Sequence, residues 1–206
     1  MFKDRIDAGI QLAEKLLPLK NEDVLVLAVP RGGLPLGAII AKSLDAPLNI
    51  VFSKKIGHPS NREYAIGAVS MDYSVLGDVG GVSQEYIKEE TARLRQKMKA
   101  RYLQYYKNIR PESLAGKTVV IVDDGIATGN TMLVTVALVS HQKPKKIIVA
   151  IPVAPSSAIR KLKELPELEE VICLETPVIF KAVGQFYENF HQLSDAEAIR
   201  ILEESN

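Results

Sequence analysis

Residues 119–131 read VVIVDDGIATGNT, and this stretch indicates the fold more clearly than any other part of the sequence. Four consecutive aliphatic residues are typical of a parallel strand that helices cover on both faces. Two adjacent carboxylates then end the strand, a short loop carries glycines and hydroxyls, and the apolar segment from Met132 predicts a helix. This order of strand, loop and helix is the repeating unit of an α/β fold.

Similar aliphatic runs recur along the chain, at residues 24–29, 48–52, 147–151 and 171–174. Amphipathic segments that predict helices separate them, at residues 34–44, 131–139 and 156–165. We therefore expect an open, mainly parallel sheet with helices on both faces. The chain has 206 residues, of which 47% are apolar and 25% charged, and this suits a single domain over residues 1–206.

Two accessory segments fall outside this alternation of strands and helices. Residues 83–110 predict a long basic amphipathic helix, with eight lysines and arginines against three acidic residues. Such a charge run is typical of a solvated helix face, although it could also be a patch for nucleic acid. Residues 176–206 hold several aromatic side chains before a final helix at 195–202, and we expect them to form a small C-terminal hood.

Composition and charge argue against several classes of function. The net charge is +1, so no overall field collects nucleic acid or an anionic membrane. The N-terminus is charged where a signal peptide would be apolar, and no aliphatic run is long enough to cross a bilayer. The single cysteine, Cys173, cannot form an internal disulfide, and we expect it in the core. We therefore expect a cytoplasmic protein with no membrane partner and no nucleic-acid partner.

The loop after Val122 has the chemistry of a site for a phosphorylated sugar. Ligands bind at the carboxyl ends of the strands in open α/β sheets. Backbone N–H groups at a helix start, with the hydroxyls of Thr128 and Thr131, can hold a phosphate. Asp123 and Asp124 would repel that anion, so they are better suited to sugar hydroxyls or to a metal ion bound directly or through water. The alternative is that the two carboxylates only cap a turn.

The spacing of this loop does not match other phosphate-binding motifs. A P-loop requires Gly-Lys-Ser/Thr and a dinucleotide fold requires G-x-G-x-x-G, and the sequence has neither. A receiver domain also begins with paired acids, but it needs a phosphoacceptor Asp at the end of a later strand. The later strands of this chain run into Pro152 and Cys173 instead.

A second candidate anion site follows the aliphatic run at 24–29. Residues 30–33 read PRGG, so that a fixed cation, Arg31, and the unhindered amides of Gly32 and Gly33 precede a helix, as an anion-binding nest requires. A plain turn from strand to helix is the alternative. The run at 48–52 also ends in cations, Lys54 and Lys55, which either balance an anion or are solvated.

The run DDGIATGNT, residues 123–131, resembles the 5-phosphoribosyl-1-diphosphate (PRPP) signature of the type I phosphoribosyltransferases. The similarity extends along nearly the whole chain to a bacterial group of this family, through residues 30–33, 65–68 and 183–185. The resemblance implies a type I phosphoribosyltransferase fold. It also implies a cytoplasmic, homodimeric enzyme of nucleotide salvage or related metabolism, which uses Mg²⁺ to transfer the phosphoribosyl group of PRPP to a small nitrogenous acceptor and releases diphosphate.

By position, the resemblance assigns a role to each loop. It implies that Asp123 and Asp124 hold the ribose hydroxyls and Mg²⁺, that residues 127–131 hold the 5-phosphate, and that residues 30–33 hold the diphosphate. Relatives often bend this last loop with a cis peptide, which here falls between Pro30 and Arg31. The implied catalytic residues are Asp123, Asp124, Arg31, Lys54 and Lys55. The implied PRPP-binding residues are Gly32, Gly33, Asp123, Asp124, Gly125, Ile126, Ala127, Thr128, Gly129, Asn130 and Thr131.

The sequence departs from the family pattern at two positions of the loop. Gly125 stands where an aliphatic residue is usual, which could alter the stiffness of the loop but removes no ligand. Ala127 stands where 6-oxopurine salvage members carry an Asp that handles the base proton, so proton transfer by that route is not expected.

Two other segments are candidates for closing the site and for binding the acceptor. Residues 57–63 lie where relatives carry a mobile catalytic loop, although an ordinary surface loop fits equally well, and we assign no catalytic role to His58. In the hood, Phe186 and Tyr187 could stack on a flat base while Gln185 bonds to its edge. The alternative is that these rings pack the C-terminal helix onto the sheet.

A regulatory protein with the same fold is the alternative function. Such a protein would sense PRPP or a nucleotide while it binds RNA or DNA, and its support is the basic run at residues 93–101. The near-zero net charge and the lack of a recognisable nucleic-acid-binding motif favour the enzyme.

Overall fold

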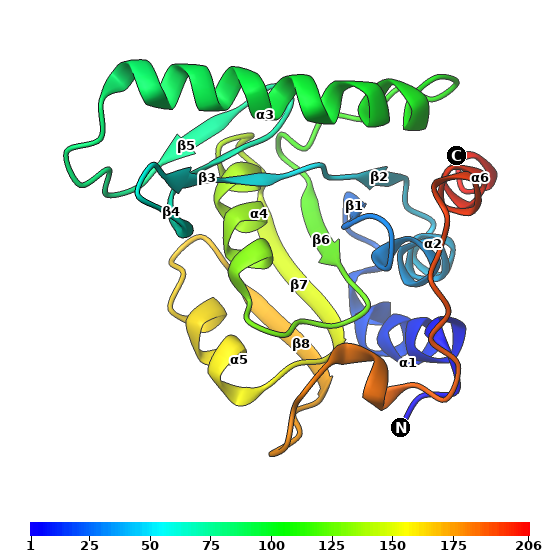
Figure 1. The fold of residues 1–206 in the computed structure, drawn as a ribbon. Helices are drawn as coiled ribbons and strands as arrows, with labels where there is room; N and C mark the ends of the chain where they lie inside the picture. The colour runs from blue at the N-terminus through cyan, green and yellow to red at the C-terminus, as the bar shows by residue number, and fades with distance from the viewer.

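The computed structural model describes the backbone of residues 1–206 and every side chain except that of Glu63. Its centre is a five-stranded sheet in the order β2-β1-β6-β7-β8 (Figure 1). The strands are β1 Val24–Ala28, β2 Leu48–Ile50, β6 Thr118–Val122, β7 Lys146–Val153 and β8 Glu170–Glu175. All neighbouring pairs in this order are parallel, which confirms the predicted fold class.

The parallel register brings the carboxyl ends of β1 and β6 together. Val24 pairs with Thr118 at the start of the two strands, and Ala28 pairs with Val122 at their end. Because the strands are about 4.8 Å apart, the loops that follow them begin side by side. These are the two loops in which the sequence places candidate anion sites.

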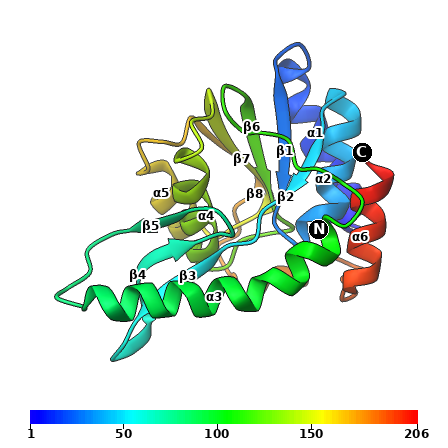
Figure 2. The ribbon, with the colours of Figure 1, turned by 90° about the horizontal axis from the view of Figure 1, so that it is seen from above.

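Helices cover both faces of the sheet (Figure 2). One face carries α1 Arg5–Leu16, α2 Gly33–Leu44 and α6 Asp195–Glu204, and the other carries α4 Asn130–Ser140 and α5 Ser156–Lys163. Alternate residues of each strand enter different cores: Val26 packs beneath α1 and α2, whereas Leu25 and Leu27 pack beneath α4 and α5. This double burial explains why the strands are continuous aliphatic runs.

A second, antiparallel sheet in the order β3-β4-β5 corrects the prediction for residues 57–63. Its strands are β3 Lys54–His58, β4 Asn61–Val69 and β5 Ser74–Leu76. The segment predicted as a loop is therefore the tip of a β-hairpin, with its turn at Pro59 and Ser60. Nδ1 of His58 accepts a hydrogen bond of 3.2 Å from the Ser60 N–H, so His58 serves the turn.

The long basic helix is present as α3 Gln84–Tyr105, and it lies across the side of the molecule where the parallel strands end (Figure 2). Three of its arginines bond to other groups of the chain and do not form one solvated face of the helix. Arg93 is paired with Glu90, the Nε of Arg95 donates to the carbonyl of Ser70 at 3.1 Å, and Arg101 is paired with Asp195. The remaining lysines of the run, including Lys97 and Lys99, are exposed.

Helix α1 is not among the segments that the sequence patterns predicted as helices. The carboxylate of Asp4 caps this helix by accepting from the N–H groups of Ile6 and Asp7, both at 2.9 Å. Ala8, Leu12 and Leu16 recur at every fourth position and are buried.

The predicted C-terminal hood divides into two parts. The short helix η2 Val183–Phe186 and residues 187–193 border the ends of the strands, whereas α6 packs against α2 and α3. Another short helix, η1 Leu17–Leu19, connects α1 to β1. Among the helices in the part of the chain that the structure describes, none is both long and apolar enough to cross a membrane.

Polar side chains close the outer edge of β2, which is the first strand of the main sheet. The hydroxyl of Tyr106 accepts from the N–H of Ile50 at 2.9 Å and donates to its carbonyl at 3.0 Å. The side-chain amide of Asn206 does the same at Leu48, donating at 2.9 Å and accepting at 3.4 Å. These contacts pair backbone groups that an edge strand would otherwise leave open.

The closure of this edge can be tested by Tyr106→Phe. The variant keeps the ring but leaves a backbone donor and acceptor of Ile50 without their partner, which should cost about 1–2 kcal/mol. We expect the melting temperature to fall by roughly 2–8 °C. Tyr73→Phe is the matched control, because Tyr73 is exposed and should tolerate the change. Equal melting temperatures for the two variants would contradict a stabilising role for Tyr106.

Candidate active site

The two loops predicted to bind anions lie in contact. A methyl group at Gly32 would be 2.1 Å from Oδ2 of Asp124, and one at Gly33 would be 2.3 Å from the carbonyl oxygen of Val122. Both glycines are therefore required by the close approach of one loop to the other. The peptide between Pro30 and Arg31 is cis, as the resemblance implied.

Between these loops and the C-terminal segment is a hollow of about 340 Å³. Arg5, Arg31, Gly32 and Asp124 line one side, and residues 190–193 line the other. The N-terminus, both predicted loops and the C-terminal segment therefore meet at the carboxyl edge of the sheet, where α/β folds bind ligands.

Arg5 is a site residue that the sequence did not reveal. Its Nε and Nη2 both lie 2.8 Å from Oδ2 of Asp124, and its Nη1 donates to the carbonyl of His191 at 2.8 Å. The guanidinium also lies 3.9 Å from the ring centroid of Phe190. The Arg5 side chain is 8% exposed and that of Asp124 is 14% exposed, so this is a buried ion pair.

Burial makes it unfavourable for Asp123 and Asp124 to be ionised. Burial raises the pKa of Asp123 well above its usual range, and the charge of Asp124 raises it further. Burial also raises the pKa of Asp124, although Arg5 opposes this shift. Asp123 accepts a hydrogen bond of 2.9 Å from the N–H of Asp124. A bound cation or a set of sugar hydroxyls would stabilise the ionised pair.

The loop after the carboxylates presents N–H groups to a ligand. The N–H of Ile126 donates to the carbonyl of Val153 at 3.0 Å, which fixes the loop, and Gly129 adopts a φ of 83° where α4 begins. In the described part of the chain, the N–H groups of residues 127–131 donate to no protein acceptor. Ala127, Thr128 and Thr131 are exposed. The positive end of α4 is thus open to an anion, as predicted for the 5-phosphate.

The departure at Gly125 has a steric reason. Its φ is 152°, and a methyl group there would lie 2.6 Å from Cγ1 of Val183. Val183 occupies the space that a larger residue at position 125 would need. The glycine thus accommodates a neighbour from the C-terminal segment.

The predicted lysines take a different position. Lys54 and Lys55 open β3, where they pair with Val69 and Ala68. Neither lysine is among the described residues that line the 340 Å³ hollow. A catalytic role for either one stays a prediction.

The contacts of the predicted acceptor-binding residues favour packing over base recognition. The side-chain oxygen of Gln185 accepts from the N–H groups of Lys181 and Ala182 at 3.0 and 3.2 Å, so the amide serves its own loop. Phe186 packs against Phe180, with ring centroids 5.1 Å apart. Tyr187 is 5% exposed, so its ring offers no open face for stacking.

Tyr187 instead packs between two aromatic rings and bonds to the backbone of the carboxylate loop. Its ring centroid is 5.5 Å from that of Phe2 and 5.0 Å from that of Phe190. Its hydroxyl donates to the backbone carbonyl of Asp124 at 2.6 Å.

Cys173 was predicted to lie in the core. It is half-buried and packs against the edge of the core under α4 and α5.

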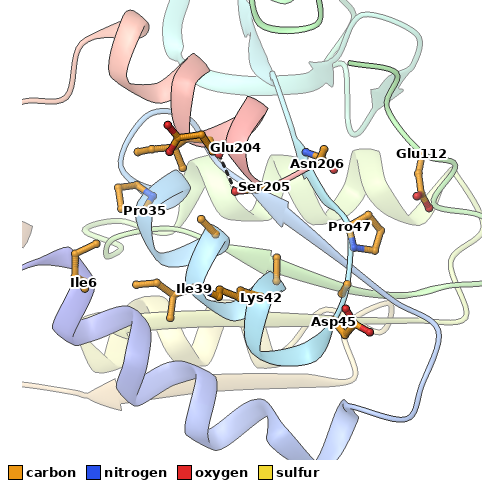
Figure 3. A pocket seen from close by; sticks show the side chains of 14 residues that line it. Ile6, Pro35, Ile39, Lys42, Asp45, Pro47, Glu112, Glu204, Ser205 and Asn206 are labelled. Carbon is orange, nitrogen blue, oxygen red and sulfur yellow. Dashed lines mark hydrogen bonds between the residues drawn. The ribbon is translucent and has the colours of Figure 1, made fainter. Parts of the chain in front are cut away.

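A larger cavity of the molecule lies elsewhere. It has a volume of about 800 Å³ and lies between the outer side of α2 and the end of α6, with Ile39, Lys42 and Asn206 among its lining (Figure 3). It contains none of the loop residues discussed above. The smaller hollow is the candidate active site, because Asp124 and the loop of Arg31 and Gly32 meet there.

Comparison with known proteins identifies the family of this chain. A sequence profile described as "Phosphoribosyl transferase domain" matches residues 3–184. Two Mycobacterium tuberculosis proteins, from strains CDC 1551 and H37Rv, carry the provisional name of phosphoribosyl transferase. Each is 36% identical to this chain over 211 residues, which is 100% of this chain and 47% of the relative. The chain belongs to the phosphoribosyl transferase domain family, and it spans about half the length of these relatives.

Solved structures show the same fold. The protein TT1426 from Thermus thermophilus is 37% identical, with a TM-score of 0.93 over 99% of this chain and 98% of that one. A Neisseria gonorrhoeae protein solved with bound ppGpp is 16% identical, with a TM-score of 0.52 over 100% of this chain and 95% of that one, and it shares the fold alone.

The raised pKa of Asp123 predicts how stability depends on pH. The folded chain holds a proton that the unfolded chain has lost, so stability falls as the pH rises from the ordinary Asp value of 3.8 toward the folded pKa. Asp123→Asn removes this effect. Without Mg²⁺ at pH 7.5, we expect the variant to melt at a higher temperature than the wild type.

This difference should disappear as the pH falls well below 3.8, where Asp123 is protonated in both the folded and the unfolded wild type. Asp72→Asn is the control, because Asp72 is exposed and its removal should leave the melting temperature unchanged. A lower melting temperature for Asp123→Asn at pH 7.5 would show that the ionised carboxylate stabilises the fold.

Proposed function

We propose that this chain is a PRPP-dependent phosphoribosyltransferase, which transfers the 5-phosphoribosyl group to a nitrogenous acceptor in nucleotide salvage or related metabolism. The observation that carries the proposal is the contact between the loop of Arg31, Gly32 and Gly33 and the loop of Asp123 and Asp124. Phosphoribosyltransferases bind PRPP and a nitrogenous base, and this chain's family membership supports the same chemistry.

Each part of PRPP has a complementary part of the site. The N–H groups of residues 127–131, at the positive end of α4, suit the 5-phosphate. Asp123 and Asp124 suit the ribose hydroxyls, which donate hydrogen bonds to carboxylates. The side chain of Arg31 and the N–H group of Gly32 suit the diphosphate, which carries the most negative charge, whereas the N–H of Gly33 already donates to the carbonyl of Val29 at 3.0 Å.

The proposed reaction replaces one bond at the anomeric carbon with another. The carbon–oxygen bond to diphosphate breaks with its electron pair going to oxygen, and a nitrogen lone pair of the acceptor forms the new bond. The acceptor nitrogen gives its proton to water or to the departing diphosphate. Positive charge develops on the ribose, and the nearby carboxylates of Asp123 and Asp124 stabilise it. Binding both substrates in one hollow supplies the positioning on which such a reaction depends.

The paired carboxylates also fit Mg²⁺, which phosphoribosyltransferases generally use with PRPP. The described residues include no group of three or more His, Cys, Asp or Glu side chains that could enclose a metal ion. Mg²⁺ rarely needs such a cage, since it is commonly held by one or two carboxylates, water and substrate phosphates. Asp123 and Asp124 would hold it, directly or through water, and its charge would offset that of the diphosphate.

The structure weakens the main argument for a nucleic-acid-binding regulator. That function rested on the basic run at residues 93–101, yet Arg93, Arg95 and Arg101 are all bonded within the chain. We therefore propose the enzyme alone, as a cytoplasmic homodimer.

A PRPP-consumption screen across purines, pyrimidines and pyridine carboxylates tests the proposal directly. The expected result is acceptor-dependent release of diphosphate with Mg²⁺ present, and its loss in Asp123→Asn, which removes a charge without changing size. Failure of the wild-type protein to bind Mg-PRPP in calorimetry would overturn the proposal.

The assignment of the diphosphate loop predicts a selective effect of Arg31→Ala. Removing a charged hydrogen-bond donor should weaken binding of Mg-PRPP about tenfold or more, while ribose 5-phosphate, which has no diphosphate, should change less than about twofold. Lys42→Ala is the matched control, because Lys42 is a cation on α2 that lies outside the hollow. Equal losses for the two ligands would contradict the assignment.

A further inference from the structure

Arg101, near the end of α3, is part of a polar cluster with the first residue of α6. Its Nη2 lies 2.7 Å from Oδ1 of Asp195, and the hydroxyl of Tyr105 donates to the same oxygen at 2.7 Å. The guanidinium lies 5.4 Å from the ring centroid of Phe52 and 5.7 Å from that of Tyr105. Two aromatic rings and a carboxylate therefore fix the position of this cation.

The strand register places this cluster next to the diphosphate loop. Phe52 follows β2 by two residues, and Ile50 at the end of β2 pairs with Ala28 at the end of β1. Arg31 lies three residues beyond Ala28, so Phe52 and Arg31 leave the same edge of the sheet on neighbouring strands.

The C-terminal segment also places this cluster near the loop of Arg31 and Gly32. Leu193, two residues before Asp195, lines the hollow together with Arg31 and Gly32. The charge of Arg31 also contributes to lowering the pKa of Asp195, after the larger effects of Tyr105 and Arg101. Figure 2 shows the end of α3 beside α6 on the side where the strands end.

The guanidinium of Arg101 is only partly satisfied. Its Nε is buried and has no hydrogen-bond partner among the described residues, while its side chain as a whole is 40% exposed. An arginine offers five donor hydrogens in a rigid fork, which matches the oxygens of a phosphate group. Because Nε itself is buried, an anionic ligand would bond to the part of the Arg101 side chain that is exposed.

We propose that Arg101 binds the diphosphate group of PRPP from the side opposite Arg31, and that Asp195 and Tyr105 hold its guanidinium in place. This inference rests on the proposed function and adds a residue to it. Arg101 is the binding residue, and Asp195 is a positioning residue that acts through it. The basic helix α3 thus contributes one specific cation to the leaving-group end of the site.

The simpler alternative is that Arg101 only fastens α3 to α6. That role predicts a loss of stability without selectivity among ligands. Calorimetric titration of Mg-diphosphate, Mg-PRPP and ribose 5-phosphate into the purified chain separates the two roles, because only the first two ligands carry the group that Arg101 would bind.

We expect Arg101→Gln to weaken Mg-diphosphate and Mg-PRPP about tenfold or more, and ribose 5-phosphate less than about twofold. Arg101→Lys keeps the charge but not the fork, so it should recover part of the lost affinity. Asp195→Asn should weaken the same two ligands by a smaller factor. Lys99→Gln removes an exposed charge from the same helix and should leave all three affinities unchanged.

Two results would overturn the inference: unchanged diphosphate affinity in a folded Arg101→Gln variant, or equal losses for all three ligands together with a lower melting temperature. These results are distinct from failure of the proposed function. In that case the wild-type protein itself would bind no Mg-PRPP, whereas here the wild type binds it and the variants show no selective loss.

Discussion

The buried ion pair between Arg5 and Asp124 joins distant parts of this chain at the candidate active site. Asp124 follows the central strand β6, Arg5 begins α1, and the same guanidinium bonds to the carbonyl of His191 in the C-terminal segment. Removing one partner of a buried pair typically costs about 3–5 kcal/mol, because the other charge is left uncompensated. The position of the Asp124 carboxylate thus depends on residues near both ends of the chain.

The sequence predicted those parts of the fold that have a clear local pattern, namely the aliphatic strands and the glycine-containing loops that follow them. Both candidate anion sites follow aliphatic runs, and the parallel register of β1 and β6 brings them into contact. The carboxylates, glycines and hydroxyls of residues 123–131, together with Gly32 and Gly33, therefore carried most of the information about the candidate site. The boundaries of α2 and α4 agree with the predicted helices to within one residue.

The remaining parts depend on contacts that no local pattern reveals. Arg5 meets a partner 119 residues away, and its neighbours give no sign that it is buried. The hairpin of β3 and β4 has a polar tip, which is why it was predicted as a loop. The sequence left both base stacking and packing open for Tyr187, and the structure shows packing: its hydroxyl bonds to the backbone of Asp124 while its ring contacts Phe2 and Phe190.

The side chains that close the edge of β2 also restrict how copies of this chain can associate. Tyr106 and Asn206 occupy the donors and acceptors at Ile50 and Leu48 that an incoming strand would need. The sheet cannot be continued across β2 into a second molecule while those bonds persist. A second copy of this chain could therefore extend the main sheet only at its opposite edge, β8.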